Sequence, residues 1–226
     1  MDKSASDVSA RSATYYQQNR EDMLKYIPQT VSKTLDLGCA EGNFSALMKN
    51  KFNAECWGVE IDSRAAQIAG TKLDKVIVAD VARCLPDVPD KYFDCVICND
   101  ILEHLPDPYS LLLDIKQKLT AGGLLVASFP NVRYCRILFD LVMRGNWDYK
   151  EFGILDRTHL RFFTYKSLLN MFPALGYELL TIEGKEPDPS MLSRLVKFVN
   201  VLLLNRFKDT IYHHFACVAR PMQQSK

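Results

Sequence analysis

The segment Thr34-Leu-Asp-Leu-Gly-Cys-Ala-Glu-Gly-Asn-Phe44 predicts a buried strand that turns on two glycines directly into a helix. Gly38 and Gly42 relieve side-chain crowding where the backbone must bend. The helix expected over residues 43–51 begins with backbone N–H groups that can receive an anionic group such as a carboxylate. A strand, glycine turn and helix in this order place a ligand at the carboxyl edge of a parallel sheet.

The spacing of the glycines restricts the kind of ligand. A dinucleotide-binding turn requires G-x-G-x-x-G, but Ala40 stands at the second glycine position and Asn43 at the third. A phosphate-binding P-loop is also excluded, because no Gly-Lys-Ser/Thr follows. A nucleoside ligand without phosphates remains.

Through Asp36, Gly38, Ala40 and Gly42, the segment resembles the first motif of the class I S-adenosylmethionine (SAM)-dependent methyltransferases. That motif is an acidic residue followed by x-G-x-G/A-x-G. The resemblance covers roughly residues 24–220 and weakens after Pro130. It implies a small-molecule methyltransferase with SAM as its cofactor.

Strand-like and helix-like stretches alternate along the chain, which favours a parallel sheet covered by helices. The expected strands are residues 34–37, 55–60, 75–79, 93–98, 123–128, 177–183 and 213–220. The expected helices are residues 15–27, 43–51, 64–71, 109–119, 132–144, 165–175 and 191–205. The resemblance implies an α/β fold, a Rossmann-like doubly wound seven-stranded sheet of order 3-2-1-4-5-7-6 with an antiparallel last strand and flanking helices.

Length and composition are those of one domain. The 226 residues are 48% hydrophobic and carry a formal net charge of +1, without the basic excess of a protein that obligately binds nucleic acid. We expect an N-terminal helical segment to about residue 30, a SAM-binding core at 31–130, and substrate-side and lid elements at 131–210.

Seven cysteines, no signal peptide and no membrane span predict a cytoplasmic protein, with peripheral contact at the inner face of the membrane as an alternative. The C-x-x-C of Cys95 and Cys98 lies on an expected strand, where both are core residues rather than metal ligands.

Polar residues follow three further strands. Glu60, with Ile61 beside it, lies about 20 residues after the glycine turn, where a carboxylate can accept from both ribose hydroxyls. Asp62 is its rival, although the position favours a helix N-cap. The resemblance implies Asp80 at the adenine amino group, with Val81 against the ring, and Asn99 with Asp100 near the methionyl part. The alternative for each carboxylate is an ordinary residue at a strand end.

Methyl transfer from a sulfonium is an in-line displacement, so the protein mainly supplies proximity and orientation. A hydroxyl acceptor usually also needs a base. His104 lies in Glu103-His-Leu-Pro-Asp-Pro108, a stretch similar to the fourth family motif, and is one candidate base or a packing residue. His159 lies in His159-Leu-Arg-Phe-Phe-Thr164, which resembles bacterial members associated with cell-surface polysaccharide and lipid-linked sugar pathways. It is a candidate base, a substrate hydrogen-bonder or a structural residue. No metal-site pattern is evident, so we expect metal-independent catalysis.

Two later segments suggest substrate contacts. An aromatic and arginine-rich stretch over residues 144–165 predicts either an acceptor pocket, which we favour, or a small satellite core. The apolar face of the helix expected over residues 191–205 predicts packing within the protein, or docking at a membrane interface or a partner.

The sequence therefore predicts a SAM-dependent methyltransferase that acts on an oxygen, less favourably a nitrogen, of a small-molecule acceptor. The resemblance of the segment after residue 145 favours a sugar or lipid-linked saccharide. A quinone or aromatic O- or C-methyltransferase is the first alternative. A non-catalytic SAM-binding or partner-binding protein is the second.

Overall fold

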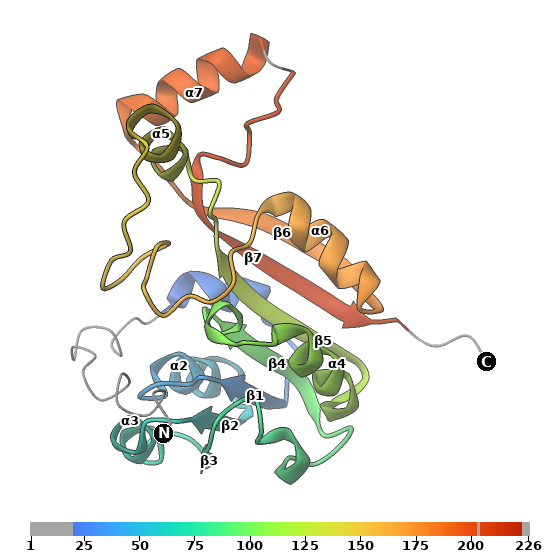
Figure 1. Cartoon of the computed structure of the whole chain (residues 1–226). Helices are drawn as coiled ribbons and strands as arrows, with labels where there is room; N and C mark the ends of the chain where they lie inside the picture. The colour runs from blue at the N-terminus through green and yellow to red at the C-terminus, as the bar shows by residue number, and fades with distance from the viewer. Residues whose placement is uncertain (1–19, 203, 223–226) are drawn as a thin grey trace. The chain divides into compact units, whose positions relative to one another are not determined.

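A computed structural model describes residues 20–202 and 204–222, except for the side chains of residues 199, 201 and 202 (Figure 1). The chain forms two compact units. Unit 1 contains residues up to 99 together with 109–126, and unit 2 contains residues 100–108 and those from 127 onward. The seven strands follow the order β3-β2-β1-β4-β5-β7-β6, which confirms the predicted topology.

Unit 1 is built on four parallel strands. These are β1 (Lys33–Leu37), β2 (Glu55–Glu60), β3 (Lys75–Val78) and β4 (Phe93–Asn99). Strand β1 lies between β2 and β4, and β3 pairs with β2, all in parallel. Leu35, Cys56, Val96 and Ile97 are fully buried, because central strands of a parallel sheet are covered on both faces.

The connections of unit 1 are short helices that return the chain to the start of the next strand. They are α2 (Asn43–Phe52), α3 (Ser63–Ala69), η2 (Leu85–Asp87) and α4 (Pro108–Lys118). The 3-10 helix η1 (Glu21–Tyr26) precedes the sheet. It is shorter than the helix predicted over residues 15–27, of which residues 15–19 lie outside the described residues.

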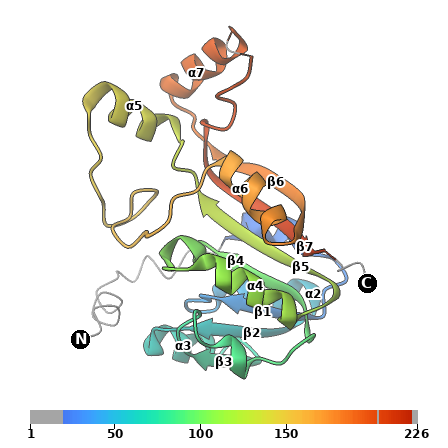
Figure 2. The same cartoon turned by 45° about the vertical axis from the view of Figure 1, so that its right-hand side comes forward.

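Strand β5 (Leu119–Pro130) is longer than predicted and passes from unit 1 into unit 2. Unit 2 contains η3 (Leu102–His104), α5 (Cys135–Arg144), α6 (Tyr165–Ala174), β6 (Tyr177–Pro187), α7 (Met191–Leu202) and β7 (Tyr212–Pro221). Strands β6 and β7 pair antiparallel, and α6 runs along β6 in both views (Figures 1 and 2). Helices α5 and α7 pack on each other beyond the end of this strand pair.

Two further sequence expectations can be compared with the structure. All seven cysteines are buried thiols, as expected for core residues. Within the described part of the chain, no helix combines the length and apolarity that a membrane crossing requires.

Candidate active site

The glycine turn after β1 has the left-handed backbone that its sequence predicts. Gly38 and Gly42 have φ values of 78° and 75°, and Ala40 between them has a φ of 49°. A Cβ atom at Gly42 would lie 3.1 Å from the Cβ of Ala69, so glycine is required for space as well as for conformation. The turn is tied to β2, because the backbone N–H groups of Gly38 and Cys39 donate to the carbonyl of Val59.

Glu60 joins this turn to the end of β2. One carboxylate oxygen accepts from the backbone N–H of Ala40 at 2.9 Å, and the other accepts from that of Asp62 at 2.9 Å. The side chain is only 7% exposed, and burial raises its pKa although hydrogen bonds from the backbone of Asp62, Ala40 and Ile61 oppose that shift. Each carboxylate oxygen has a second lone pair, so Glu60 can also accept from two ligand hydroxyls.

Asp62 caps α3, as predicted for the rival of Glu60. Its side chain accepts from the backbone N–H groups of Arg64 at 2.8 Å and Ala65 at 3.2 Å. Between the two acidic residues, Ile61 is 44% exposed at the same sheet edge.

Asp36 lies on β1, two residues before Gly38 of the glycine turn. It is 3% exposed, and the Ser45 hydroxyl donates to it at 2.6 Å. Burial raises the pKa of Asp36 to about 6, with a further contribution from the nearby charge of Glu60 and against the Ser45 hydrogen bond. The side chain therefore joins β1 to α2, the two elements that the glycine turn connects.

This burial makes a pH-dependent contribution to stability. Because the folded state holds the Asp36 proton more tightly than the unfolded chain, the contribution of Asp36 to stability is largest below pH 4 and is lost as the pH rises through about 6. Asp36→Asn keeps an oxygen for Ser45 and should raise the free energy of unfolding above pH 6.5 by roughly 2–3 kcal/mol relative to the wild type, with little difference at pH 4. Denaturant titrations of both proteins between pH 4 and 8 measure this difference.

Asp188→Asn is the control, because its effect on the free energy of unfolding should have the opposite sign. Burial alone would raise the pKa of Asp188, but hydrogen bonds from Tyr134, Ser190 and Arg136 lower it. Its loss should destabilise the protein at neutral pH. A pH-independent effect of Asp36→Asn would contradict the assignment of a raised pKa to Asp36.

The ends of β3 and β4 complete the edge. Asp80 caps the turn that follows β3, because its side chain accepts from the backbone N–H of Ala82 at 2.9 Å. Val81 beside it is 6% exposed. Among the described residues, neither amide atom of the Asn99 side chain has a hydrogen-bond partner, although both are shielded from solvent. A buried, unpartnered amide is costly unless a ligand pairs with it.

The strand register aligns these positions. Leu37 pairs with Val59, Glu60 with Val78, and Asp36 with Ile97. The glycine turn, Glu60, the β3 end and Asn99 therefore belong to one carboxyl edge of unit 1, as the sequence predicted. Asp100 follows with a φ of 48° and belongs to unit 2, where its carboxylate accepts from the Ser128 hydroxyl at 2.7 Å.

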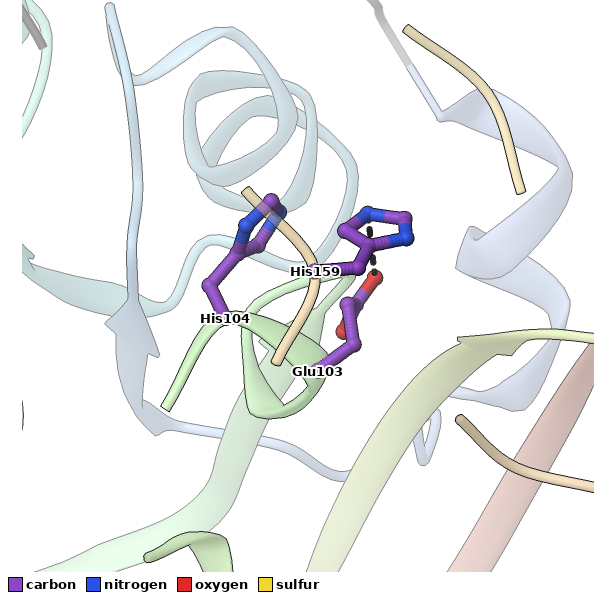
Figure 3. Close-up of side chains that lie close together, drawn as sticks. All are labelled: Glu103, His104 and His159. Carbon is purple, nitrogen blue, oxygen red and sulfur yellow. Dashed lines mark ion pairs between the residues drawn. The ribbon is translucent and has the colours of Figure 1, made fainter. Parts of the chain in front are cut away.

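Unit 2 brings together Glu103, His104 and His159, which we call the Glu-His-His cluster (Figure 3). One potential ligand atom from each residue lies within 4.8 Å of the other two. The Nε2 atom of His159 is 4.0 Å from Oε1 of Glu103, and the two imidazole rings meet edge to face with centroids 4.6 Å apart. Glu103 is fully buried and His159 is 9% exposed, so the cluster lies largely out of water.

The segment containing His159 is held against η3 by its backbone. The N–H groups of Leu160 and Arg161 both donate to the carbonyl of Glu103, at 2.8 and 3.0 Å. Arg161 also reaches the carbonyl of Pro106 with its side chain. These contacts bring the two predicted histidines together. Glu103 had no role predicted from the sequence, because only the fold shows that its carboxylate faces His159.

The predicted aromatic and arginine pocket stays a prediction, because the structure gives these side chains several different partners. Arg144 pairs with Asp140 at 2.9 Å and Arg157 with Glu151 at 3.0 Å, both as exposed ion pairs. The aromatic rings do not form one cluster. Trp147 meets Phe162 with ring centroids 5.6 Å apart, and Phe163 packs on Phe129. Tyr149 and Phe152 are 55% and 75% exposed. Ion pairing with neighbouring carboxylates therefore accounts for two of the three arginines.

Comparison with known proteins agrees with this architecture. Residues 9–182 match the family model described as "Methyltransferase domain". A ubiquinone biosynthesis O-methyltransferase from Idiomarina loihiensis is 28% identical over 162 residues, covering 67% of this chain and 64% of that protein. One from Pasteurella multocida is 26% identical over 190 residues, covering 72% and 77%. The chain thus spans slightly less than two thirds of the length of the Idiomarina protein.

A solved structure with a similar fold is a SAM-dependent methyltransferase from Archaeoglobus fulgidus. It superposes with a TM-score of 0.67 at 23% identity, covering 88% of this chain and 90% of that one. The chain belongs to the methyltransferase domain family. Its fold is that of the Archaeoglobus protein, which is described as dependent on SAM.

The residues present fit this cofactor. The unpartnered amide of Asn99, the two remaining acceptor positions of Glu60 and the left-handed turn at residues 38–42 are suited to a nucleoside that carries an amino-acid group. Their roles in holding it stay predictions.

Proposed function

We propose that this protein is an O-methyltransferase that moves the methyl group of SAM to a hydroxyl oxygen of a small-molecule acceptor. The observation that carries the proposal is the Glu-His-His cluster, in which a buried carboxylate faces one of two adjacent imidazoles. A hydroxyl must lose its proton to become a good nucleophile, whereas a neutral amine need not, and such a cluster is the kind of group that serves the first reaction.

Unit 1 would hold the cofactor, which when bound supplies an activated methyl group on a sulfonium. Glu60 would accept from the ribose hydroxyls, and Asp80 with Val81 would bind the adenine. Asn99 would pair with the methionyl part, whose carboxylate the turn at residues 38–42 would receive. These groups orient the cofactor, and orientation is the main contribution a protein makes to this displacement.

Unit 2 would handle the acceptor proton. Nδ1 of His159 lies 3.0 Å from the carbonyl of Ile154, which favours the tautomer with the proton on Nδ1 and Nε2 turned toward Glu103. Nδ1 of His104 lies 3.0 Å from the hydroxyl of Thr158 and 3.3 Å from its carbonyl. These contacts hold both rings in place. Nε2 of His159 would then be the atom that receives the proton of the acceptor hydroxyl.

The acceptor class that we favour is a quinone precursor, a hydroxylated aromatic ring with a long apolar tail. Two observations support it. The relatives described above are named for O-methylation in ubiquinone biosynthesis. Unit 2 also exposes an apolar surface of the kind that a lipid-like acceptor requires. The sugar acceptor predicted from residues 159–164 remains the alternative outcome of the test.

That surface consists of two stripes on the packed helices α5 and α7. On α7, Met191, Leu195 and Phe198 are 85%, 59% and 72% exposed and share one face, because they are spaced four and three residues apart. On α5, Val142 and Met143 are 75% and 69% exposed. Exposed Arg194 and Lys197 also lie on α7. Apolar side chains flanked by basic ones suit the interface of an anionic membrane, where a lipid-like acceptor would be found.

The helix has a second apolar side that packs inside the protein. Leu192 and Val196 pack against a cluster formed by Tyr134, Cys135 and Ile154. Packing within the protein therefore involves one face of α7, and the proposed membrane contact would involve the other. The packed face anchors α7, and the stripe from Met191 to Phe198 is available for contact.

Phe198→Glu tests the membrane contact. We expect co-sedimentation with vesicles containing anionic lipid to weaken at least tenfold, since a large apolar side chain contributes about 1.5–3 kcal/mol when buried. Leu113→Glu is the matched control, because Leu113 is a 45% exposed apolar residue on α4 of unit 1. Equal loss in both variants, or wild-type protein that stays in the supernatant, would contradict the contact.

The acceptor itself is identified by transfer from methyl-labelled SAM. Purified protein would be incubated with hydroxylated quinone precursors, with lipid-linked saccharides and with free sugars. Label in a methyl ether of the quinone precursor is the expected result. Label in a saccharide would replace the favoured acceptor class. Tight binding of S-adenosylhomocysteine without any transfer would support the non-catalytic alternative.

A further inference from the structure

We infer that the Glu-His-His cluster is a binding site for a divalent transition-metal ion of the zinc type. Two imidazole nitrogens and one carboxylate oxygen form a ligand set of catalytic zinc sites, which leave one coordination position open. Glu103 and His104 are neighbours in η3, and His159 comes from a distant segment that the fold brings against them. Spacing along the sequence therefore gave no sign of this site.

The distances suit an ion better than a direct hydrogen bond. The 4.0 Å between Nε2 of His159 and Oε1 of Glu103 is too long for a hydrogen bond. Bonds of about 2.0–2.1 Å around a tetrahedral ion would separate two ligand atoms by roughly 3.3 Å. Side-chain adjustments of about an ångström would therefore bring the three donors, now within 4.8 Å of one another, to bonding distance.

The surroundings resemble those of bound metal ligands. A histidine that binds a metal usually directs its other ring nitrogen to a backbone carbonyl or a carboxylate-linked group. Nδ1 of His159 contacts the carbonyl of Ile154. Nδ1 of His104 contacts Thr158, whose hydroxyl donates to Asp156 at 2.6 Å. Asp156 also accepts from the backbone N–H of Thr158, so the support is itself rigid.

Such an ion would deepen the proposed function, on which this step depends. The acceptor hydroxyl would occupy the open position and lose its proton to solvent more readily there. An oxygen lone pair would then form the new C–O bond, the C–S bond of the sulfonium would break, and its electron pair would remain on sulfur. His104 and His159 would act as ligands in this reaction rather than as bases.

Metal binding can be tested without methyl transfer. Protein made without a histidine tag and stripped with a chelator would be titrated with Zn²⁺ by calorimetry and with Co²⁺ by visible absorption. We expect one ion per chain with a dissociation constant of about 1 μM or lower, and cobalt bands of a four-coordinate site. Glu103→Gln and His159→Asn should each weaken binding at least 100-fold.

His214→Gln is the matched control. His214 also faces a carboxylate in unit 2, with its Nδ1 3.6 Å from Glu186, but it belongs to no three-residue donor cluster among the described residues. This variant should bind like the wild type. Because Glu103 is buried and its variant could unfold, His104→Asn provides a second test at a half-exposed ligand, and thermal melting checks each fold.

Each outcome bears on one claim. Stoichiometric binding that the cluster variants lose supports the site. Absence of binding, or equal binding by the cluster variants, overturns it. Methyl transfer that continues unchanged after the ion has been removed would overturn the role of the ion in the reaction and leave the O-methyltransferase proposal standing. Tight metal binding without transfer to any acceptor would support the metal site and contradict the O-methyltransferase proposal.

Discussion

Glu60→Ala is expected to weaken the binding of S-adenosylhomocysteine by about 100-fold. The variant removes the acceptor for two ribose hydroxyls, and hydrogen bonds to a charged group contribute about 1.5–3 kcal/mol each. It also releases the backbone N–H groups of Ala40 and Asp62, which the carboxylate now holds at 2.9 Å. Both effects act on the cofactor site, and calorimetric titration measures their sum.

Glu55→Ala is the control at the other end of the same strand. The Glu55 carboxylate is also engaged, by the indole N–H of Trp57 at 2.6 Å and the Tyr92 hydroxyl at 3.0 Å. Its removal should leave the affinity within about twofold, because that end of β2 is not the carboxyl edge. An affinity unchanged by Glu60→Ala, with the fold intact by thermal melting, would remove the ribose assignment.

His159→Asn should lower kcat by about 100-fold or more and leave the affinity for S-adenosylhomocysteine unchanged. The range for losing a positioned proton-transfer group is about 10²–10⁴. Asparagine can still donate to the carbonyl of Ile154, so the segment should keep its place. The expected separation follows because His159 belongs to unit 2, whereas the residues expected to hold the cofactor, apart from Asp100, belong to unit 1.

Steady-state kinetics with the acceptor that the labelling experiment identifies, together with calorimetry, separate the effect on kcat from the effect on cofactor affinity. A fall in cofactor affinity equal to the fall in kcat would show that the variant has disturbed the whole protein. Full activity in His159→Asn would exclude both roles proposed for this residue, base and metal ligand. His214→Gln should retain the kinetics of the wild type.

The composition of the carboxyl edge of unit 1 was predictable because parallel sheets obey a simple rule. Strands that run in one direction end at one edge, so Glu60, Asp80 and Asn99 could be assigned to that edge from the order of strands alone. The register places Leu37 beside Val59 and Glu60 beside Val78, as this rule requires. The N-cap role of Asp62 was equally local, since it depends only on the residues that follow.

Predictions about unit 2 were less specific, because several of its side chains could have more than one kind of partner. The arginines of residues 144–165 suggested an anion site, but Arg144 and Arg157 pair with nearby carboxylates on the surface. The apolar helix near residue 191 was predicted correctly as a helix, yet which of its two apolar sides packs inward depended on Tyr134 and Ile154.

The sequence by itself determined the glycine turn and the strand-end positions of Glu60, Asp80 and Asn99, because these follow from local conformation. Its resemblance to a known family implied the strand order, which the structure confirms. Tertiary structure alone decided that Glu103, His104 and His159 meet. That meeting depends on the N–H groups of Leu160 and Arg161 finding the carbonyl of Glu103, a long-range pairing that carries no periodic signal along the chain.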